Sequence, residues 1–246
     1  MGERAEALSD GSEAELMQLV SSANIACGQH AGDLLTMEAT VLLAAKSDVA
    51  VGAHPGYSDR ANFGRLSVRM PATQVVRLVY EQIRSLGNLA RAHHRELVHV
   101  KPHGALYHDA AANPSIAEAI ASGAAQWSRN LILVGLAGSP VLDVWRDRGF
   151  AVAPEGFADR TYEPDGTLRT RNLHGAVITD RNKAAQQALR IVTKGSVLTS
   201  AGTELTVRAE TICVHSDTPG AIEILKAVRE ELIKGGISIE CLKPSN

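Results

Sequence analysis

The sequence predicts an α/β fold in which helices cover a parallel sheet. Short apolar runs alternate with helical patterns six times along the 246 residues. Most of these runs are apolar throughout, as in strands that are buried on both faces. An open, doubly wound sheet and a closed α/β barrel both fit this alternation. No GxGxxG motif follows a strand and no GxxxxGK[ST] motif occurs, which removes the usual nucleotide-binding evidence for the open sheet.

Each element follows from a local pattern. Strands are expected where apolar runs end in polar turns, over residues 24–27, 49–53, 97–100, 131–135, 150–160 and 211–215. The main helices are expected over residues 33–46, 71–93, 114–127, 140–148, 181–194 and 219–234. The longest of them repeats apolar residues at helical spacing, namely Val75, Val79, Ile83, Leu86 and Ala90. A hairpin is expected about residues 201–202, and residues 237–242 are a candidate for a last strand.

The composition predicts a single large domain, residues 1–246, because 45% of the residues are hydrophobic and can form a substantial core. The net charge of −2 provides no basic stripe for nucleic acid. No run approaches the ~18 apolar residues of a membrane span, and the acidic N-terminus is unlike a signal peptide. Cys27, Cys213 and Cys241 lack zinc-site spacing and leave an odd thiol in any disulfide scheme. We therefore expect a cytoplasmic protein.

Titratable side chains follow five of the six predicted strands. In α/β barrels the active site lies at the carboxyl ends of the strands, where the loops converge. We therefore expect these side chains to line one shared pocket. They are His30 with Asp33, His54, Lys101 with His103, Glu155 with Asp159 and Arg160, and His215 with Asp217.

Each of these residues also has a purely structural interpretation. A single histidine after a strand is more often a hydrogen-bond partner than a catalytic group. Lys101 could extend its ammonium group to solvent, and Asp217, which precedes Thr218 and Pro219, fits a helix N-cap. The convergence of these residues, rather than any one of them, indicates a functional site.

The histidines raise the question of a metal ion. Neutral imidazoles with carboxylates suit zinc or another divalent ion. No HxxxH or HExxH motif places two ligands on one helical face, so histidine ligands would have to come from different strands: His30, His54, His103 and His215. A divalent metal is compatible with the sequence but is not predicted by it.

Six collinear segments resemble a known family. They are SSANIACGQHAGD, VGAHPGYSD, FGR, HVKPHGALY, EGFADRTY and TICVHSDTPGA. The resemblance covers nearly the whole chain, residues 2 to about 235. These segments resemble the LamB/YcsF family. The resemblance implies a seven-stranded, TIM-like α/β barrel related to glycoside hydrolase and deacetylase folds. It also implies ATP-dependent 5-oxoprolinase activity, which cleaves the lactam of 5-oxo-L-proline to L-glutamate with two partner subunits, PxpB and PxpC. The missing P-loop favours ATP binding with those partners.

The resemblance also implies roles for the residues at the strand ends. The expected catalytic residues are His54, Lys101, His103, His215 and Asp217, and the expected substrate-binding residues are His30, Asp33, Glu155, Asp159 and Arg160. Asp217 or His215 would act as the general base. Lys101 and Arg160 would stabilise negative charge or bind the substrate carboxylate. His54 or His103 would donate a proton to the leaving nitrogen.

The chain departs from the family pattern at several places. Gln29, Leu66 and Ser216 stand where the family motifs carry an aromatic residue, an arginine and a glycine. Family members usually begin with a strand that reads roughly DLNCDMGE, whereas this sequence starts with Met1-Gly2-Glu3, the tail of that motif. We therefore expect the first of the seven strands to be missing. An open strand edge would lower the stability or support a homo-oligomer.

Two other functions stay open. One is a stand-alone, metal-dependent deacetylase or amidohydrolase, which would need neither ATP nor partner subunits. The other is a non-catalytic ligand-binding subunit, which the number of titratable groups disfavours.

Overall fold

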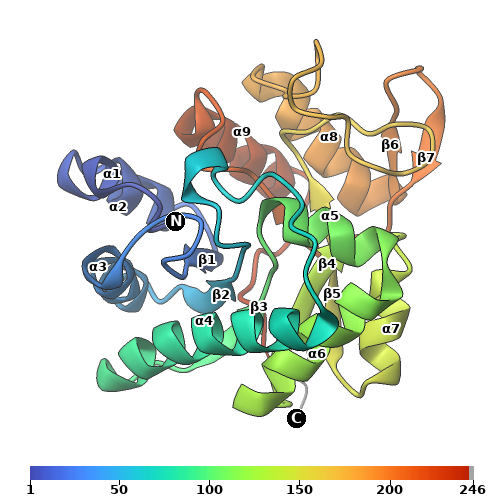
Figure 1. Cartoon of the computed structure of the whole chain (residues 1–246). Coiled ribbons are helices and arrows are strands. Elements are labelled where there is room, and N and C mark those ends of the chain that lie inside the picture. Colours follow the sequence, from blue (N-terminus) through green and yellow to red (C-terminus); the bar gives the residue numbers. More distant parts are fainter. Residues whose placement is uncertain (244–246) are drawn as a thin grey trace. The chain divides into compact units, whose positions relative to one another are not determined.

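A computed structural model describes residues 1–243 and has the predicted α/β alternation (Figure 1). All six strands predicted for the main sheet are present, in the order β1-β2-β3-β4-β5-β8. The strands are β1 (Ser22–Ala26), β2 (Ala50–His54), β3 (Leu97–Val100), β4 (Ile132–Leu136), β5 (Ala151–Phe157), β6 (Ser196–Leu198), β7 (Glu204–Thr206) and β8 (Thr211–Cys213). The helices are α1 (Ala5–Ser9), α2 (Ser12–Met17), α3 (Leu34–Lys46), α4 (Ala72–Ala92), α5 (Gly104–Ala112), α6 (Pro114–Trp127), α7 (Val141–Asp147), α8 (Arg181–Lys194) and α9 (Ala221–Lys234), with a 3-10 turn η1 (Arg60–Asn62).

The first of two compact units comprises Met1–Gly135, Pro140–Val152 and the described residues from Cys241 on. In this unit β1, β2, β3 and β4 pair in chain order, and every pair is parallel. Parallel neighbours need a crossover connection, which is α3 between β1 and β2 and α4 between β2 and β3. Because the strands are parallel, their carboxyl ends share one edge, and the segments that follow β2 and β3 begin side by side.

Helix α4 supplies a large part of the core of this unit. The five residues predicted for its inner face are all fully buried: Val75, Val79, Ile83, Leu86 and Ala90. Burial of each large aliphatic side chain contributes about 1.5–3 kcal/mol. Helix α3 contacts β1 and β2, and α4 contacts β2 and β3, so the apolar side of α4 is directed at the sheet, as the spacing predicts.

The second unit comprises Leu136–Ser139 and Ala153–Glu240. Here β5 pairs in parallel with β8, and the N–H of Ala137 donates to the carbonyl of Glu155 at 3.0 Å. Helices α8 and α9 pack against each other over a small apolar core that includes Ile224. This unit therefore has its own sheet segment and its own helical cover.

Two predictions for the chain after β5 have opposite outcomes. The hairpin is confirmed, because β6 and β7 pair in antiparallel fashion around the predicted turn. The prediction of a last strand is wrong, because residues 237–242 form no strand. Ile237 and Ile239 instead pack against the apolar core of α8 and α9. Their alternation with polar residues reflects this packing and not a strand ladder.

The edge of β1 away from β2 is bonded to the first residue of the chain. The N-terminal ammonium of Met1 donates to the carbonyl of Asn24 at 3.0 Å, and the N–H of Ala26 donates to the carbonyl of Met1 at 2.9 Å. This is the hydrogen-bond pattern of a parallel bridge, and it fixes Met1 and Gly2 beside β1. Within residues 1–243 the main sheet has six strands; the seventh strand and the single domain stay predictions.

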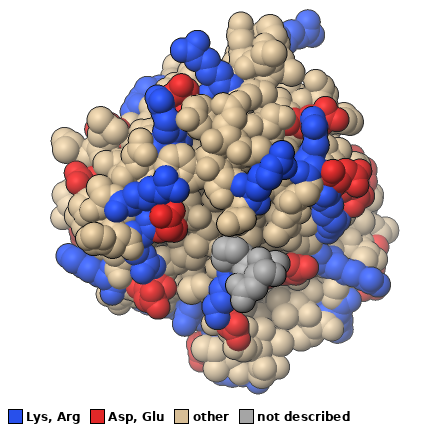
Figure 2. Space-filling view, turned by 90° about the horizontal axis from the view of Figure 1, so that it is seen from below, with Lys and Arg blue, Asp and Glu red and all other residues tan. Residues whose placement is uncertain are grey.

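Charged side chains are mixed on the surface. On the face seen in Figure 2, Lys and Arg alternate with Asp and Glu, and neither sign forms a continuous patch there. Among residues 1–243, no helix has the length and apolar character needed to cross a membrane.

Candidate functional site

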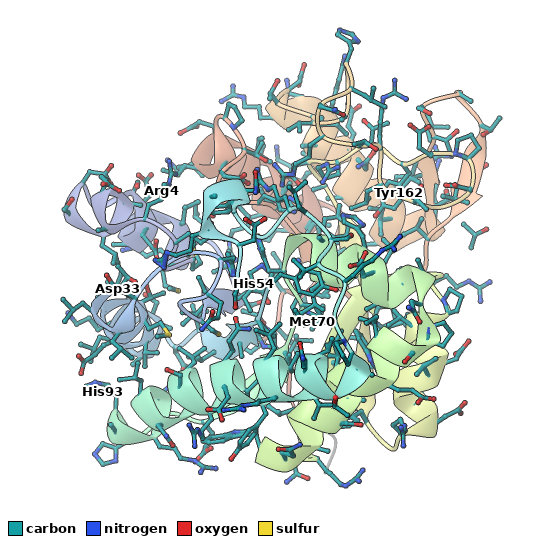
Figure 3. All side chains as sticks on the ribbon, in the orientation of Figure 1. Arg4, Asp33, His54, Met70, His93 and Tyr162 are labelled. Carbon is teal, nitrogen blue, oxygen red and sulfur yellow. The ribbon has the colours of Figure 1, made fainter. Side chains whose placement is uncertain are left out.

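Two neighbouring strand ends bring His54 and His103 together. The backbone pairing of β2 and β3 continues beyond the strands, since the N–H of Lys101 donates to Ala53 (2.9 Å) and the N–H of His103 donates to Pro55 (2.8 Å). As a result Nε2 of His54 lies 3.0 Å from Nδ1 of His103. His54, labelled in Figure 3, marks this edge of the first unit.

The loop that follows β2 is held by a buried glutamine of α4. Gln82 accepts a hydrogen bond from the N–H of Gly56 (3.0 Å) and donates one to its carbonyl (2.8 Å). Only 2% of Gln82 is exposed, so this pair of bonds is shielded from water. The direction in which the chain leaves His54 is therefore set by α4.

A second loop closes over the imidazoles. Phe63, which has a left-handed φ of 56°, accepts a hydrogen bond from Nε2 of His103 at 2.8 Å. Gly64 follows with a φ of +65°, and a Cβ at this position would lie 2.8 Å from the Cβ of His30. Glycine is required here by both the conformation and the close approach. The loop can therefore contact the rings through its backbone.

His30 completes a cluster of three imidazoles. Its ring stacks on that of His103, with centroids 3.7 Å apart, and meets His54 edge-to-face at 5.7 Å. Only 1% of His30 is exposed. Burial is the main cause that lowers the pKa of His30 below its ordinary value. A third neutral ring therefore lies against the pair formed by His54 and His103.

The electrostatic environment keeps His54 and His103 neutral. Burial, followed by electrostatic repulsion of an imidazolium by His103 and Lys101, lowers the pKa of His54 well below its ordinary value. Burial and the neighbouring His30 lower the pKa of His103 to about 3. Nδ1 of His54 also contacts the carbonyl of Lys101 at 2.6 Å. Both rings therefore bond to a backbone carbonyl through one nitrogen and face each other through the other.

Sequence reasoning missed Glu3 as a member of this cluster. Its carboxylate lies within 4.8 Å of ring nitrogens of both His54 and His103, and 3.7 Å from Nε2 of His30. Burial alone would raise the pKa of Glu3, but the N-terminal ammonium and His30 hold it below its ordinary value. The available signal was the family motif DLNCDMGE, whose last residue corresponds to Glu3.

Lys101 and Asp33 have defined structural environments. Lys101 is 5% exposed, and its Nζ lies 5.8 Å from the centre of the Tyr107 ring. The ammonium group therefore does not extend into solvent.

Asp33 is the N-cap of α3: its carboxylate accepts from the N–H of Thr36 (2.9 Å), and the Thr36 hydroxyl accepts from the N–H of Asp33 (2.7 Å). A role for Asp33 in substrate binding stays a prediction.

In the second unit, a buried carboxylate holds His215. Asp159 accepts hydrogen bonds from Nδ1 of His215 (3.0 Å), from its backbone N–H (3.0 Å) and from the Thr218 hydroxyl (2.6 Å). Burial alone would raise the pKa of Asp159, but the charge and hydrogen bonds of His215, with the bond from Thr218, lower it to about 2. The ring of His215 stacks on Phe157 at 5.4 Å. This arrangement leaves Nε2 of His215 as the ring atom that can accept a proton.

The other predicted residues of this unit are tied into its loops. Arg160 donates to the carbonyls of Ala176 (3.2 Å) and Arg169 (2.5 Å). Burial, followed by the charge of Arg171, lowers its pKa to about 10. Asp217 accepts from Arg171 at 3.3 Å. The N-cap of α9 is a glycine, Gly220, so the N-cap interpretation of Asp217 is wrong.

The predicted site residues divide between the two units. The first unit contains His30, Asp33, His54, Lys101 and His103, and the second contains Glu155, Asp159, Arg160, His215 and Asp217. Glu155 is only 3% exposed. The structure brings three of the first group together with Glu3, and it joins Asp159 to His215. One pocket shared by both groups stays a prediction.

Comparison with known proteins identifies relatives along the whole chain. The family model of the LamB/YcsF family matches residues 1–246. The 5-oxoprolinase subunit designated A from Brevibacillus brevis is 43% identical over 239 residues, which cover 97% of this chain and 94% of that protein. Its counterpart from Methylococcus capsulatus is 46% identical over 232 residues, covering 94% and 89%. The crystal structure of a lactam utilization protein from Thermus thermophilus superposes with a TM-score of 0.90 at 40% identity, covering 98% of this chain and 96% of that one.

Proposed function

Because this chain belongs to the LamB/YcsF family, we propose that it is the PxpA component of an ATP-dependent 5-oxoprolinase. The reaction opens the lactam ring of 5-oxo-L-proline to give L-glutamate and is driven by ATP hydrolysis. One observation carries this proposal: the two 5-oxoprolinase subunits compared above are 43% and 46% identical to this chain over nearly its whole length. The titratable side chains at the strand ends supply the acid–base groups that such a hydrolase needs.

In this proposal ATP and partner subunits provide the driving force. A five-membered lactam is a resonance-stabilised amide, so its carbonyl carbon needs activation. Transfer of a phosphoryl group from ATP to the amide oxygen would make this carbon a good electrophile. Because the sequence contains no P-loop, we assign ATP binding to the partners PxpB and PxpC in a cytoplasmic complex. We also propose that the complete fold is a closed, TIM-like barrel.

We assign the activation of water to His215. Its Nδ1 donates to Asp159, so Nε2 can accept a proton, and the carboxylate stabilises the imidazolium that forms. In the hydrolytic step the oxygen of water bonds to the carbonyl carbon while its proton passes to Nε2. The ring C–N bond then breaks, and the nitrogen takes up the proton held by Nε2 of His215 as it leaves. The product of this step is an acyl phosphate, and a second water molecule cleaves it to L-glutamate and inorganic phosphate.

The pKa shifts change the role proposed for His54 and His103. Protonation of the leaving nitrogen requires a ring that carries an extra proton near neutral pH. Burial lowers the pKa of both rings, that of His103 to about 3, so neither is suited to this step. Lys101 remains the group proposed to stabilise negative charge, because a shielded ammonium interacts strongly with nearby anions.

The test is glutamate release from 5-oxo-L-proline by the purified chain combined with its cognate PxpB and PxpC subunits and ATP. We expect turnover only when all components are present. We expect His215→Gln to lower the rate by about 10²-fold or more, the usual contribution of a general base. His174→Gln is the matched control, because His174 is an exposed histidine of the same unit.

Two results would contradict the proposal. Amide hydrolysis by this chain alone, without ATP, would indicate a stand-alone metal-dependent deacetylase or amidohydrolase. Full turnover by the partner subunits without this chain would indicate a non-catalytic ligand-binding subunit.

A further inference from the structure

Three donor groups from separate segments converge in the first unit. They are the carboxylate of Glu3 and one ring nitrogen each of His54 and His103, and all three donor atoms lie within 4.8 Å of one another. Glu3 belongs to the segment that Met1 bonds to β1, His54 ends β2, and His103 follows β3. Because a different element positions each residue, the group forms only in the folded chain.

The hydrogen bonds of the two imidazoles fix which ring nitrogen carries the proton. A carbonyl oxygen can only accept, so Nδ1 of His54 must donate to the carbonyl of Lys101 at 2.6 Å. By the same reasoning, Nε2 of His103 must donate to the carbonyl of Phe63 at 2.8 Å. In neutral rings the lone pairs therefore lie on Nε2 of His54 and Nδ1 of His103. These two atoms face each other at 3.0 Å.

Two lone pairs at this distance repel each other unless they share a positive particle. A shared proton would account for the two nitrogens but not for the carboxylate of Glu3, which lies within 4.8 Å of both. A divalent cation can be bound by all three groups at once. Two nitrogens that bind one ion at about 2.0–2.1 Å with tetrahedral geometry lie about 3.3 Å apart, so the observed separation of 3.0 Å has to widen by only a few tenths of an ångström.

His30 gives an independent indication of a ligand at this place. It is 1% exposed, and neither of its ring nitrogens has a hydrogen-bond partner among the described residues. Its ring stacks on His103 at 3.7 Å, and its Nε2 lies 3.7 Å from the carboxylate of Glu3. Buried polar atoms are nearly always paired in folded proteins. A water molecule or another ligand held by an ion here would give His30 its partner.

We propose that Glu3, His54 and His103 bind one divalent first-row metal ion, with zinc as the expected ion. Two imidazoles and a carboxylate are the protein ligands of a common class of catalytic zinc site, which keeps a further position for water or substrate. The carbonyls that accept from the other ring nitrogens are the outer partners typical of metal-bound histidines. The ion would polarise a carbonyl oxygen or lower the pKa of a bound water molecule. This inference concerns ion binding and does not depend on the 5-oxoprolinase assignment.

The test is metal binding by the tag-free chain alone, without ATP, substrate or partner subunits. After treatment with a chelator and dialysis, Zn²⁺ is titrated by calorimetry, with Mn²⁺ and Co²⁺ in parallel, and bound metal per chain is measured by mass spectrometry. We expect one ion per chain. We expect Glu3→Gln and His103→Gln each to weaken binding by about 100-fold or more, since loss of even an outer partner costs about 10–100-fold.

Glu38 and His93 provide a matched control. They form a partly buried glutamate–histidine pair at 2.8 Å, and His93, labelled in Figure 3, lies at the end of α4. Glu38→Gln and His93→Gln should leave the affinity unchanged. The proposal is overturned if the wild-type chain binds none of the three ions. It is also overturned if the control variants lose the ion while the Glu3 and His103 variants keep it.

A second measurement does not require any variant to fold. Long-range ¹H–¹⁵N spectra of the wild-type imidazoles report the state of each ring nitrogen. On addition of Zn²⁺ we expect the resonances of His54 Nε2 and His103 Nδ1 to shift, and those of His99, whose Nε2 bonds to Asn24, to stay in place. Unchanged resonances of His54 and His103 in the presence of Zn²⁺ would refute the site.

Discussion

Two histidine sites in this molecule use the same residue type in opposite ways. In the first unit, His54 and His103 donate their ring protons to backbone carbonyls. In the second unit, His215 donates to the carboxylate of Asp159. Each of the three histidines lies at the carboxyl end of a parallel strand of its own unit, His54 within the strand and the other two shortly after it. Their place in the fold therefore does not explain the difference.

The partner of the second ring nitrogen explains it. A carbonyl oxygen fixes the tautomer but adds no net charge, so desolvation keeps the ring neutral and its lone pair can bind a cation. A carboxylate adds a full negative charge, which stabilises the imidazolium and suits the ring to accept a proton. The role of a histidine at a strand end is thus set by the group that accepts the hydrogen bond from its second ring nitrogen.

The largest effect is expected from changing the partner of His215. Asp159→Asn keeps the size of the side chain and removes the negative charge, so an imidazolium at His215 loses its stabilisation. We expect kcat/KM for glutamate release by the reconstituted complex to fall by about 10²–10⁴-fold. The pH–rate profile should change as well, because the strength of the base changes. Rates measured across the neutral pH range test both effects.

Thr218→Val is the control for this change. It removes one hydrogen bond to Asp159, of 2.6 Å, and leaves the charge in place. We expect a loss of less than about 10-fold, in line with one hydrogen bond. Equal losses in both variants, with an unchanged pH profile, would mean that Asp159 is only a structural acceptor, and the contrast between the two sites would disappear.

A further histidine of the first unit allows burial to be tested away from the three-imidazole cluster. His99 extends from β3 across β2 to Asn24 on β1, where its Nε2 lies 2.9 Å from the amide oxygen. The ring passes over Gly52, where a Cβ would lie 2.0 Å from Nε2. We expect Gly52→Ala to lower the free energy of unfolding by about 3 kcal/mol, the upper range for overpacking. Urea denaturation measures this change.

A double-mutant cycle identifies the cause of that loss. In a His99→Ala background, the ring that the new methyl group would meet is absent. Gly52→Ala should then lower the free energy of unfolding by less than about 1 kcal/mol, so that the two changes are strongly non-additive. The same loss in both backgrounds would show that the backbone around Gly52, and not His99, excludes the methyl group.

The strands and helices could be predicted because their signals are local. Helices α6 and α8 begin and end at the predicted residues, since Pro114 lies in the first turn of one and Asp180 caps the other. The prediction failed at residues 237–242, where the apolar alternation came from contact with the core of helices α8 and α9. Apolar periodicity shows which side of a segment is buried. It does not show whether the segment pairs with a strand or packs against helices.

The candidate site could be predicted only in part. Polar residues after neighbouring parallel strands pointed to His54 and His103. Glu3 joins them from the other side of β1, and the carbonyl of Phe63 reaches His103 through a loop 40 residues away. Which carbonyl faces a ring depends on the tertiary fold. The tautomers of these histidines, which distinguish a metal ligand from a general base, therefore could not be derived from the sequence.

Acid should affect the two units in different pH ranges. The pKa values of His99 and His103 are about 3 in the folded chain, below the ordinary 6.5, so the unfolded chain binds more protons between these values. The free energy of unfolding is therefore not reduced by these two histidines above pH 6.5, and it decreases as the pH falls toward 3. The pKa of Asp159 is about 2 instead of 3.8, so its contribution is lost only below pH 3.8. Within its range each group changes the stability by about 1.4 kcal/mol per pH unit.

His99→Gln isolates one of these groups. Between pH 6.5 and 5.5 its free energy of unfolding should decrease by about 1 kcal/mol less than that of the wild-type chain, because half of the unfolded His99 side chains are already protonated at pH 6.5. Urea denaturation with a chelator in every sample measures the two slopes without a contribution from bound ions. Equal slopes would show that His99 does not become protonated on unfolding in this range, contrary to its assignment as a neutral ring.

The smallest effect is expected at Asp217, two residues after His215. Asp217 pairs with Arg171 at 3.3 Å, and the two side chains are 27% and 26% exposed. Pairs of this kind contribute about 0.2–1 kcal/mol, so Arg171→Ala should lower the free energy of unfolding by less than about 1 kcal/mol.

If His215 is the base, Asp217→Asn should also leave kcat/KM within about 10-fold of the wild-type value, because the general-base contribution of 10²–10⁴ is retained. A loss as large as that of Asp159→Asn would instead make Asp217 the base. A carboxylate would then activate the water, and the contrast between the histidine sites would no longer account for the chemistry of the second unit.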